Sequence, residues 1–189
     1  MRLRLAELAL LIGASGLSAC STWQGPALYA PSENVDPFPH GLYRFVDDGK
    51  PSDARWDGTR FIEVGKEARP DDKDIPDLVI VPLALPGRDL HLIQATSHST
   101  SDGQKKPDSE FFLVRRNGPQ FLLVMPDCAT SMKIVRGAGG VVVRLPNKTV
   151  SNPSGLVCRF TTRVSLEAAA RRYAIQSKLP GVPFTRVGD

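Results

Sequence analysis

Short apolar segments recur along most of the chain and are separated by residues that favour turns. Some alternate apolar and polar side chains, which is the period of a half-buried strand, and others are continuous apolar runs of strand length. Each segment therefore predicts one strand. The nine strands predicted in this way cover residues 42–46, 59–64, 78–85, 90–95, 110–116, 120–125, 132–136, 141–145 and 156–161.

Turn signals join several of these segments into hairpins. Residues 86–89, Pro-Gly-Arg-Asp, separate the third segment from the fourth. Residues 117–118, Asn-Gly, form a two-residue hairpin signal because both tolerate positive φ, and Pro119 leaves the turn type open. Residues 137–140, Gly-Ala-Gly-Gly, predict a second hairpin between the seventh and eighth segments.

One helix is predicted near the C-terminus. Ser165 is the expected N-cap, and Pro180 with Gly181 ends the helical pattern. The apolar residues between them share one face at helical spacing, which predicts that this face packs on the sheet. They are Leu166, Ala170, Tyr173 and Ala174.

Nine closely spaced strands and one terminal helix place the chain in the mainly β (α+β) class. The expected architecture is an antiparallel β-barrel or sandwich of about nine strands, with one C-terminal helix over an open face or end. Closure into a barrel would remove the unpaired edges of so many apolar strands. The pattern leaves the choice between barrel and sandwich open.

The first residues carry the layout of an export signal. Arg2 and Arg4 form a short positive segment, and an apolar stretch follows over about residues 5–17, interrupted by Glu7. This stretch is shorter than the roughly 18 residues of a membrane-spanning helix, and no other apolar run reaches that length. The segment is therefore expected to direct export rather than to stay as a membrane helix.

The end of this segment resembles the lipobox of bacterial lipoproteins, in which a Leu and two small residues precede a Cys. The resemblance implies cleavage before Cys20, a diacylglyceryl thioether on its sulfur and, in most cases, an acyl group on the new amino terminus. Two or three acyl chains suffice for stable anchoring. Ser21 stands where an Asp marks inner-membrane retention, so the resemblance implies the cell outer membrane, facing the periplasm. The residues that carry it are Leu17, Ser18, Ala19 and Cys20.

Proline content divides the remaining chain. Prolines are frequent between residues 21 and 39, and because proline fixes φ and lacks an N–H, this stretch predicts a semi-extended tether. Trp23 and Tyr29 in it either lie at the membrane interface or pack on the domain. The expected parts are a signal peptide (1–19), the lipidated Cys with the tether (20–40), a β-rich globular domain (41–178) and a C-terminal tail (179–189).

Charge and cysteine content narrow the chemistry. The 189 residues hold 24 Lys and Arg against 20 Asp and Glu, a net charge of +4 that is too mild to indicate nucleic-acid binding. With Cys20 acylated, Cys128 and Cys158 remain, and export to an oxidising compartment predicts a disulfide between them. The alternative is two free thiols, although no neighbouring His would activate either one.

Basic residues gather in the second half of the chain. Some of them are expected to bind phosphate groups of an anionic lipid or polysaccharide through the planar guanidinium, and the alternative is an ordinary solvated surface. No cofactor or metal ion is expected, because the odd spacing of His91 and His98 places them on opposite faces of a strand. The candidate anion-binding residues are Arg115, Arg116, Arg159, Arg171 and Arg172.

These observations favour a non-catalytic, lipid-anchored envelope protein. Its expected partners are the membrane, through Cys20, and a protein or other envelope component, but no nucleic acid. The first alternative is a small β-barrel that carries an apolar ligand. A periplasmic hydrolase ranks third, since Ser97, His98 and Asp102 supply the residue types of a triad without a nucleophile-elbow motif.

Overall fold

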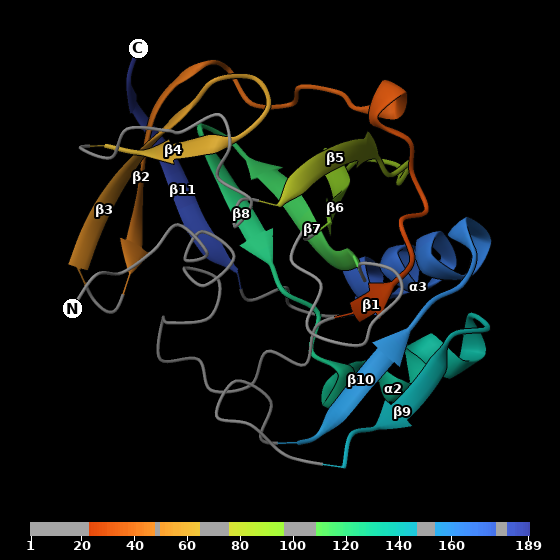
Figure 1. Ribbon diagram of the computed structural model, residues 1–189. Helices are drawn as coiled ribbons and strands as arrows, with labels where there is room; N and C mark the ends of the chain where they lie inside the picture. The colour runs from red at the N-terminus through yellow and green to blue at the C-terminus, as the bar shows by residue number, and fades with distance from the viewer. Residues whose placement is uncertain (1–22, 48–49, 65–75, 97–108, 147–153, 177–180) are drawn as a thin grey trace.

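The computed structural model describes residues 23–47, 50–64, 76–96, 109–146, 154–176 and 181–189 (Figure 1). Among these residues eleven strands form one sheet, accompanied by two α-helices and a short 3-10 turn. The predicted class, mainly β with a helix toward the C-terminus, is confirmed. The elements are β1 (Trp23–Gly25), η1 (Pro31–Glu33), β2 (Gly41–Asp47), β3 (Lys50–Trp56), β4 (Phe61–Glu63), β5 (Asp77–Pro82), β6 (Leu90–Thr96), β7 (Ser109–Asn117), β8 (Gln120–Val124), α2 (Cys128–Gly137), β9 (Val141–Arg144), β10 (Leu156–Arg159), α3 (Arg163–Gln176) and β11 (Val182–Gly188).

The sheet divides into two branches at β7. One edge of β7 pairs with β6, and β5 lies beyond β6. The other edge is shared, because residues 109–111 pair with β1 whereas residues 113–117 pair with β8. One branch continues from β8 through β11, β2, β3 and β4, and the shorter branch runs from β1 through β10 to β9 (Figure 1). Of the strand pairs described, β1 with β10 is parallel and the others are antiparallel.

An aromatic cluster fills the concave face of the longer branch. The ring of Phe38 lies at its centre, with centroids 4.8 Å from Phe121, 5.1 Å from Trp56 and 5.5 Å from Phe61. Ile80 of β5 joins the same cluster, so strands on both sides of β7 contribute to one core. Edge-to-face pairs of this kind are worth about 0.5–1.5 kcal/mol each beyond their burial. Packing around this cluster curls the sheet. The sheet does not close into a barrel, since β4 and β5 are not paired in the described structure.

Residues 34–40 cross the open side between β5 and β3. The Ile80 N–H donates to Asn34 Oδ1 at 2.7 Å, and the Val35 N–H donates to the Ile80 carbonyl at 2.8 Å. At the other side, Trp56 Nε1 donates to Asp36 Oδ1 at 2.7 Å. The expected tether is therefore a packed strap here, because burying Phe38, 3% exposed, outweighs the extended preference of the surrounding prolines.

The two helices cover the other face of the sheet. Figure 1 shows α2 and α3 next to β1, β9 and β10. The predicted apolar face of α3 is confirmed, since Leu166, Ala170, Tyr173 and Ala174 are all buried in the second core cluster, together with Val135 of α2. The start of α3 differs from the prediction. It begins at Arg163 and Thr162 caps it, accepting the Ser165 N–H at 3.2 Å, so Ser165 lies in the first turn.

The segment 132–136 forms part of helix α2 and not the predicted strand. Asp127 is the reason, because its carboxylate accepts the N–H groups of Ala129 and Thr130 at 2.9 and 3.2 Å and so caps a helix that begins at Cys128. The expected hairpin over residues 137–140 is instead the helix end, where Gly139 takes a positive φ of 85°.

Two segments expected to lie outside the domain belong to the sheet. β1 lies between β7 and β10, although its residues were expected to form the tether. β11 lies between β8 and β2, although its residues were expected to form a loose tail. A strand of three residues, and one carrying Pro183, have too little alternation to be recognised along the chain, so their partner strands determine them.

The hairpin predicted after residue 116 is confirmed, with its turn shifted by one residue. Asn117 pairs with Gln120, so the two turn residues are Gly118 and Pro119. Gly118 has a φ of 60°, and a Gly at the first turn position is the requirement of a type II′ turn. Pro119 is accommodated because the second position of that turn takes a negative φ.

Candidate functional site

The described chain begins at Trp23, the first residue of β1. This strand pairs with β7, where the sheet divides into its two branches. Trp23 is fully buried, and its Nε1 donates to Ser131 Oγ at 3.0 Å. Its ring lies 5.0 Å from Phe160 and 5.6 Å from Tyr173, measured between centroids. Of the two roles considered for Trp23, packing on the domain is the one the structure shows. This residue fixes the first described strand to both helices and to β10.

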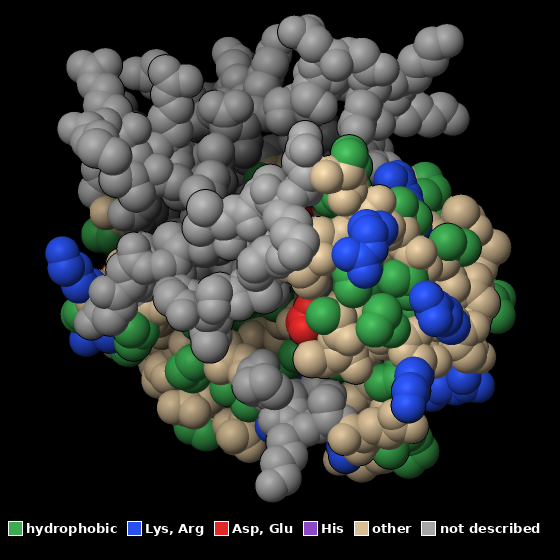
Figure 2. Space-filling model, turned by 90° about the horizontal axis from the view of Figure 1, so that it is seen from below, with side chains coloured by type: hydrophobic (Ala, Val, Ile, Leu, Met, Phe, Trp, Pro, Cys, Tyr) green, Lys and Arg blue, Asp and Glu red, His purple; other side chains and the backbone are tan. Residues whose placement is uncertain are grey.

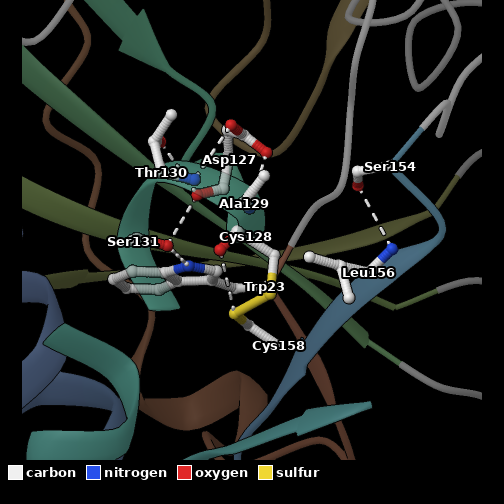
Figure 3. The surroundings of a disulfide bond; sticks show 9 residues. All are labelled: Trp23, Asp127, Cys128, Ala129, Thr130, Ser131, Ser154, Leu156 and Cys158. Atoms are coloured by element: carbon white, nitrogen blue, oxygen red, sulfur yellow. Dashed lines mark hydrogen bonds between the residues drawn. A yellow bond between two sulfur atoms is a disulfide. The ribbon is translucent and has the colours of Figure 1, made fainter. Parts of the chain in front are cut away.

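Cys128 and Cys158 lie in disulfide geometry beside Trp23, with their Cα atoms 5.4 Å apart (Figure 3). Cys128 is the first residue of α2, and Cys158 is the partner of Trp23 in the parallel pair of β1 and β10. Both cysteines are fully buried. The bridge therefore ties the start of a helix to the strand that holds the chain's entry.

Gln94 fixes the backbone that follows β1. This side chain is 1% exposed, and its Oε1 accepts the N–H groups of Leu28 and Tyr29 at 2.6 and 2.9 Å. Its Nε2 donates to the Tyr29 carbonyl at 3.1 Å. One buried amide thus satisfies three backbone groups of a segment that belongs to no regular element.

Arg163, at the start of α3, holds the same segment from the surface. Its guanidinium forms a two-point contact with Glu33, donates to the Leu28 carbonyl and lies 4.7 Å from the Tyr29 ring centroid. Hydrogen bonds from Arg163 lower the pKa of Glu33. Burial, together with the nearby carboxylate of Glu167, raises the pKa of Tyr29. Glu33 therefore stays charged beside Arg163, and the Tyr29 hydroxyl stays neutral beside Glu167.

The arginines proposed for anion binding are distributed over several surfaces. Arg115 and Arg116 are neighbours on β7 and point to opposite faces. Arg115 is half-buried, and its Nε makes no hydrogen bond within the described part of the chain. Arg116 lies over the Phe121 ring, 5.8 Å from its centroid, on the aromatic side. These two residues do not form one binding surface.

The other three arginines lie on β10 and α3. Arg159 is half-buried on β10, between Gln24 of β1 and Val141 of β9. Arg171 donates to Glu167 at 2.7 Å and to the Ala84 carbonyl at 3.2 Å. Arg172 donates to the Gly137 carbonyl at 2.7 Å and so joins α3 to the end of α2. The guanidinium groups on α3 thus have structural partners.

A second set of basic residues lies on the surface around α2 and β9 and forms no ion pair with any other residue that the structure describes. Lys133 and Arg136 are exposed on α2, and Arg144 is exposed at the end of β9. They were part of the basic second half of the sequence but not of the candidate set. The signal that distinguishes them is local: no Asp or Glu occurs between residues 128 and 163.

The residues considered for hydrolase chemistry and for metal binding are described only in part. Ser97, His98 and Asp102 lie outside the described residues. His91 lies on β6, with Nδ1 3.5 Å from Asp89 Oδ1, and its side chain is 15% exposed. Burial lowers the pKa of His91, which favours the neutral imidazole. Within the described chain, no group of three His, Cys, Asp or Glu side chains could hold a metal ion.

In the described residues, no helix combines the length and the apolar character needed to cross a bilayer. Comparison with protein-family models, with curated proteins and with solved structures found no match to this chain.

Proposed function

We propose that this protein is a lipid-anchored bacterial envelope protein that acts by binding and performs no catalysis. The observation that carries the proposal is the short distance along the chain between the lipobox cysteine, Cys20, and the buried Trp23. Three residues span at most about 11 Å. An acylated Cys20 would therefore hold the folded domain directly at the bilayer surface, with no tether between them.

The arrangement of the two cores supports binding over transport of an apolar ligand. The concave face of the curled sheet is occupied by rings in mutual contact, with Phe38 within 5.5 Å of three others. A carrier needs an apolar cavity of several hundred cubic ångströms. With these rings in place, we assign recognition to the outer surface of the domain.

Metabolic labelling tests the anchor. Cells that express the protein are grown with radioactive palmitate, and the wild-type chain is expected to take up label and to fractionate with membranes. Cys20→Ala is expected to lose the label. The matched control is the double variant Cys128→Ala/Cys158→Ala, which removes the other two cysteines and is expected to remain labelled. Label on Cys20→Ala would overturn the proposal.

Position 21 tests the membrane to which the protein is sorted. Ser21→Asp is expected to retain palmitate and to move from the outer-membrane to the inner-membrane fraction, since Asp after the lipidated Cys marks retention. Ser21→Asn has a similar size without the charge and is the control. Wild-type protein that fractionates with the inner membrane would contradict the assignment to the outer membrane.

A further inference from the structure

The point where the chain enters β1 defines which end of the shorter branch faces the anchor. Trp23 pairs with Cys158, Cys158 pairs with Val142, and Leu156 pairs with Arg144. Because β1 and β10 are parallel and β9 is antiparallel, the chain enters β1 at the end of the branch where β9 finishes with Arg144. Neighbouring strands are about 4.8 Å apart, so the β9 backbone lies about 10 Å from that of β1.

Arg144 stands at this end, and helix α2, which leads into the start of β9, adds further positive charge. Residues 128–163 contain six Lys and Arg and no Asp or Glu. Four of them are exposed in the described structure, Lys133, Arg136, Arg144 and Arg163, and Arg163 is paired with Glu33. Figure 2, which views the molecule from below, shows Lys and Arg side chains spread over the part of the surface near these elements, with little Asp or Glu among the described atoms.

The acidic residue that directly precedes this stretch of the chain has a role of its own. Asp127 precedes α2, and its carboxylate accepts two backbone N–H groups of the first turn, from Ala129 and Thr130. A carboxylate in this position compensates the positive end of the helix dipole. Lys133 and Arg136 lie further along the helix, on its exposed side. Within the described part of the chain neither of them forms an ion pair, which leaves both charges available to an external anion.

Apolar side chains accompany the basic ones. Val141, the first residue of β9, is 57% exposed, and Leu145, directly after its last residue, is 37% exposed. β9 is the last strand of its branch, with one described partner, β10. Figure 2 shows hydrophobic side chains between the basic ones on this part of the surface. Alternation along the strand puts Val141 and Leu145 on one face of β9 and Arg144 on the other, so both kinds of side chain border its outer edge. Basic and apolar side chains along one edge suit the interface of an anionic bilayer, where both phosphate groups and acyl boundaries are within reach.

We propose that the α2–β9 surface, defined as Lys133, Arg136, Val141, Arg144 and Leu145, rests on the anionic phospholipid headgroups of the membrane that holds the anchor. The inference rests on the proposed acylation of Cys20, because the anchor brings this surface to the bilayer. The occupant follows from charge complementarity and from the short connection between Cys20 and Trp23, which only two residues separate. The surface fixes how the domain is oriented on the membrane. The longer branch, with its aromatic cluster, then faces away from the lipid.

Hydrogen–deuterium exchange of the full lipidated protein in vesicles tests this orientation. One vesicle preparation is phosphatidylcholine alone, and the other contains a third of phosphatidylglycerol. Exchange of backbone amides in residues 128–145 is expected to be about tenfold slower in the anionic vesicles than in the neutral ones. Added salt at 0.5 M is expected to remove most of the difference, because exposed charges are screened.

A pair of matched charge-reversal variants separates this surface from a general effect of charge. Lys133→Glu/Arg144→Glu is expected to abolish the difference between the two vesicle types. Arg55→Glu/Arg116→Glu changes the net charge equally at exposed positions on β3 and β7 and is expected to retain it. Equal exchange of residues 128–145 in both vesicles by wild-type protein that carries palmitate would overturn the orientation alone. Protein that carries no palmitate and does not join vesicles would instead overturn the proposed anchor.

Discussion

At the scale of single residues, a buried amide decides whether the N-terminal segment belongs to the domain. Gln94 satisfies three backbone groups of Leu28 and Tyr29 at 1% exposure. Gln94→Met keeps the volume and leaves those groups without partners. We expect a loss of about 3 kcal/mol in the free energy of unfolding, measured in urea, because each unsatisfied buried group costs about 1–3 kcal/mol.

The control for this variant lies on the same strand. Thr96→Val removes one hydroxyl, whose Oγ1 lies 2.8 Å from Ser109 Oγ, and should cost about 1 kcal/mol. A Gln94→Met protein as stable as wild type would show that residues 28 and 29 are not held in this way.

His91 gives the protein a pH dependence whose direction follows from its burial. Burial lowers the pKa of His91, although Asp89 beside it opposes part of the shift. An unfolded His takes up its proton near pH 6.5, so below that pH the unfolded state binds more protons than the folded one. The stabilisation that comes from neutral His91 is therefore fully present above about pH 6.5. Below that pH the free energy of unfolding falls as the pH drops.

His91→Gln removes the pH-dependent contribution of His91 to stability. Unfolding free energies measured between pH 7.5 and pH 5 are expected to decline less for the variant than for wild type. This window lies above the range in which Glu33 and Asp53 titrate, since their arginine partners lower the pKa of both carboxyls. Parallel pH profiles for the two proteins would contradict the assignment to His91.

At the scale of elements, the cysteine pair links α2 to β10 across 30 residues of chain. Closing a loop of this length restricts the unfolded chain and stabilises the fold by about 3–4 kcal/mol in the chain-entropy model. Cys128→Ala/Cys158→Ala should lose about this amount in a urea titration. Reduced wild-type protein should lose a similar amount, and unchanged stability under reduction would show that the thiols are free in the isolated protein.

The last strand supplies a stricter test of the sheet order. β11 lies between β8 and β2, and Phe184 stacks on Phe61 with centroids 5.7 Å apart. Deletion of residues 182–189 would leave β8 and β2 with unpaired edges, and we expect loss of the cooperative unfolding transition. Deletion of Asp189 alone, the control, should change little. A loose tail would make both deletions neutral.

The local pattern of apolar and polar residues predicted most strands, and each of its failures has a physical cause. Strands β2, β6, β7 and β8 match alternating or apolar segments, because side-chain burial alone determines them. β3 was missed, since Pro51 and charged residues obscure the alternation that ends in the buried Ala54 and Trp56. β1 and β11 depend on partner strands distant in sequence. Segment 132–136 became helical through Asp127, a cap outside the segment itself.

The same contrast holds for the candidate site. The pairing of Cys128 with Cys158 needs only the count of cysteines and the compartment, and the structure places both residues within bonding geometry. The basic residues could not be sorted from the sequence, because whether an arginine is free depends on neighbours such as Glu167 and the Gly137 carbonyl. The lack of Asp and Glu between residues 128 and 163 was the sequence feature that could have pointed to Lys133, Arg136 and Arg144.

At the scale of the whole molecule, the account predicts that the distance between anchor and domain matters. Insertion of ten Gly and Ser residues between Ser21 and Thr22 would add a flexible segment with a mean span of about 17 Å. Palmitate incorporation is expected to be unchanged. Slow exchange of residues 128–145 in anionic vesicles is expected to weaken, because the domain is no longer confined at the surface. Full protection after the insertion would show that the surface binds lipid without help from the anchor.

The central claim is that acylated Cys20 begins the mature chain and holds the domain at the membrane. Mass spectrometry of the N-terminal peptide, from protein purified out of the membrane fraction, tests it most directly. The predicted result is a peptide that starts at Cys20 and carries the mass of a diacylglyceryl group, with or without an N-acyl chain. A membrane-derived peptide that starts at another residue, or an unmodified Cys20, would contradict the account.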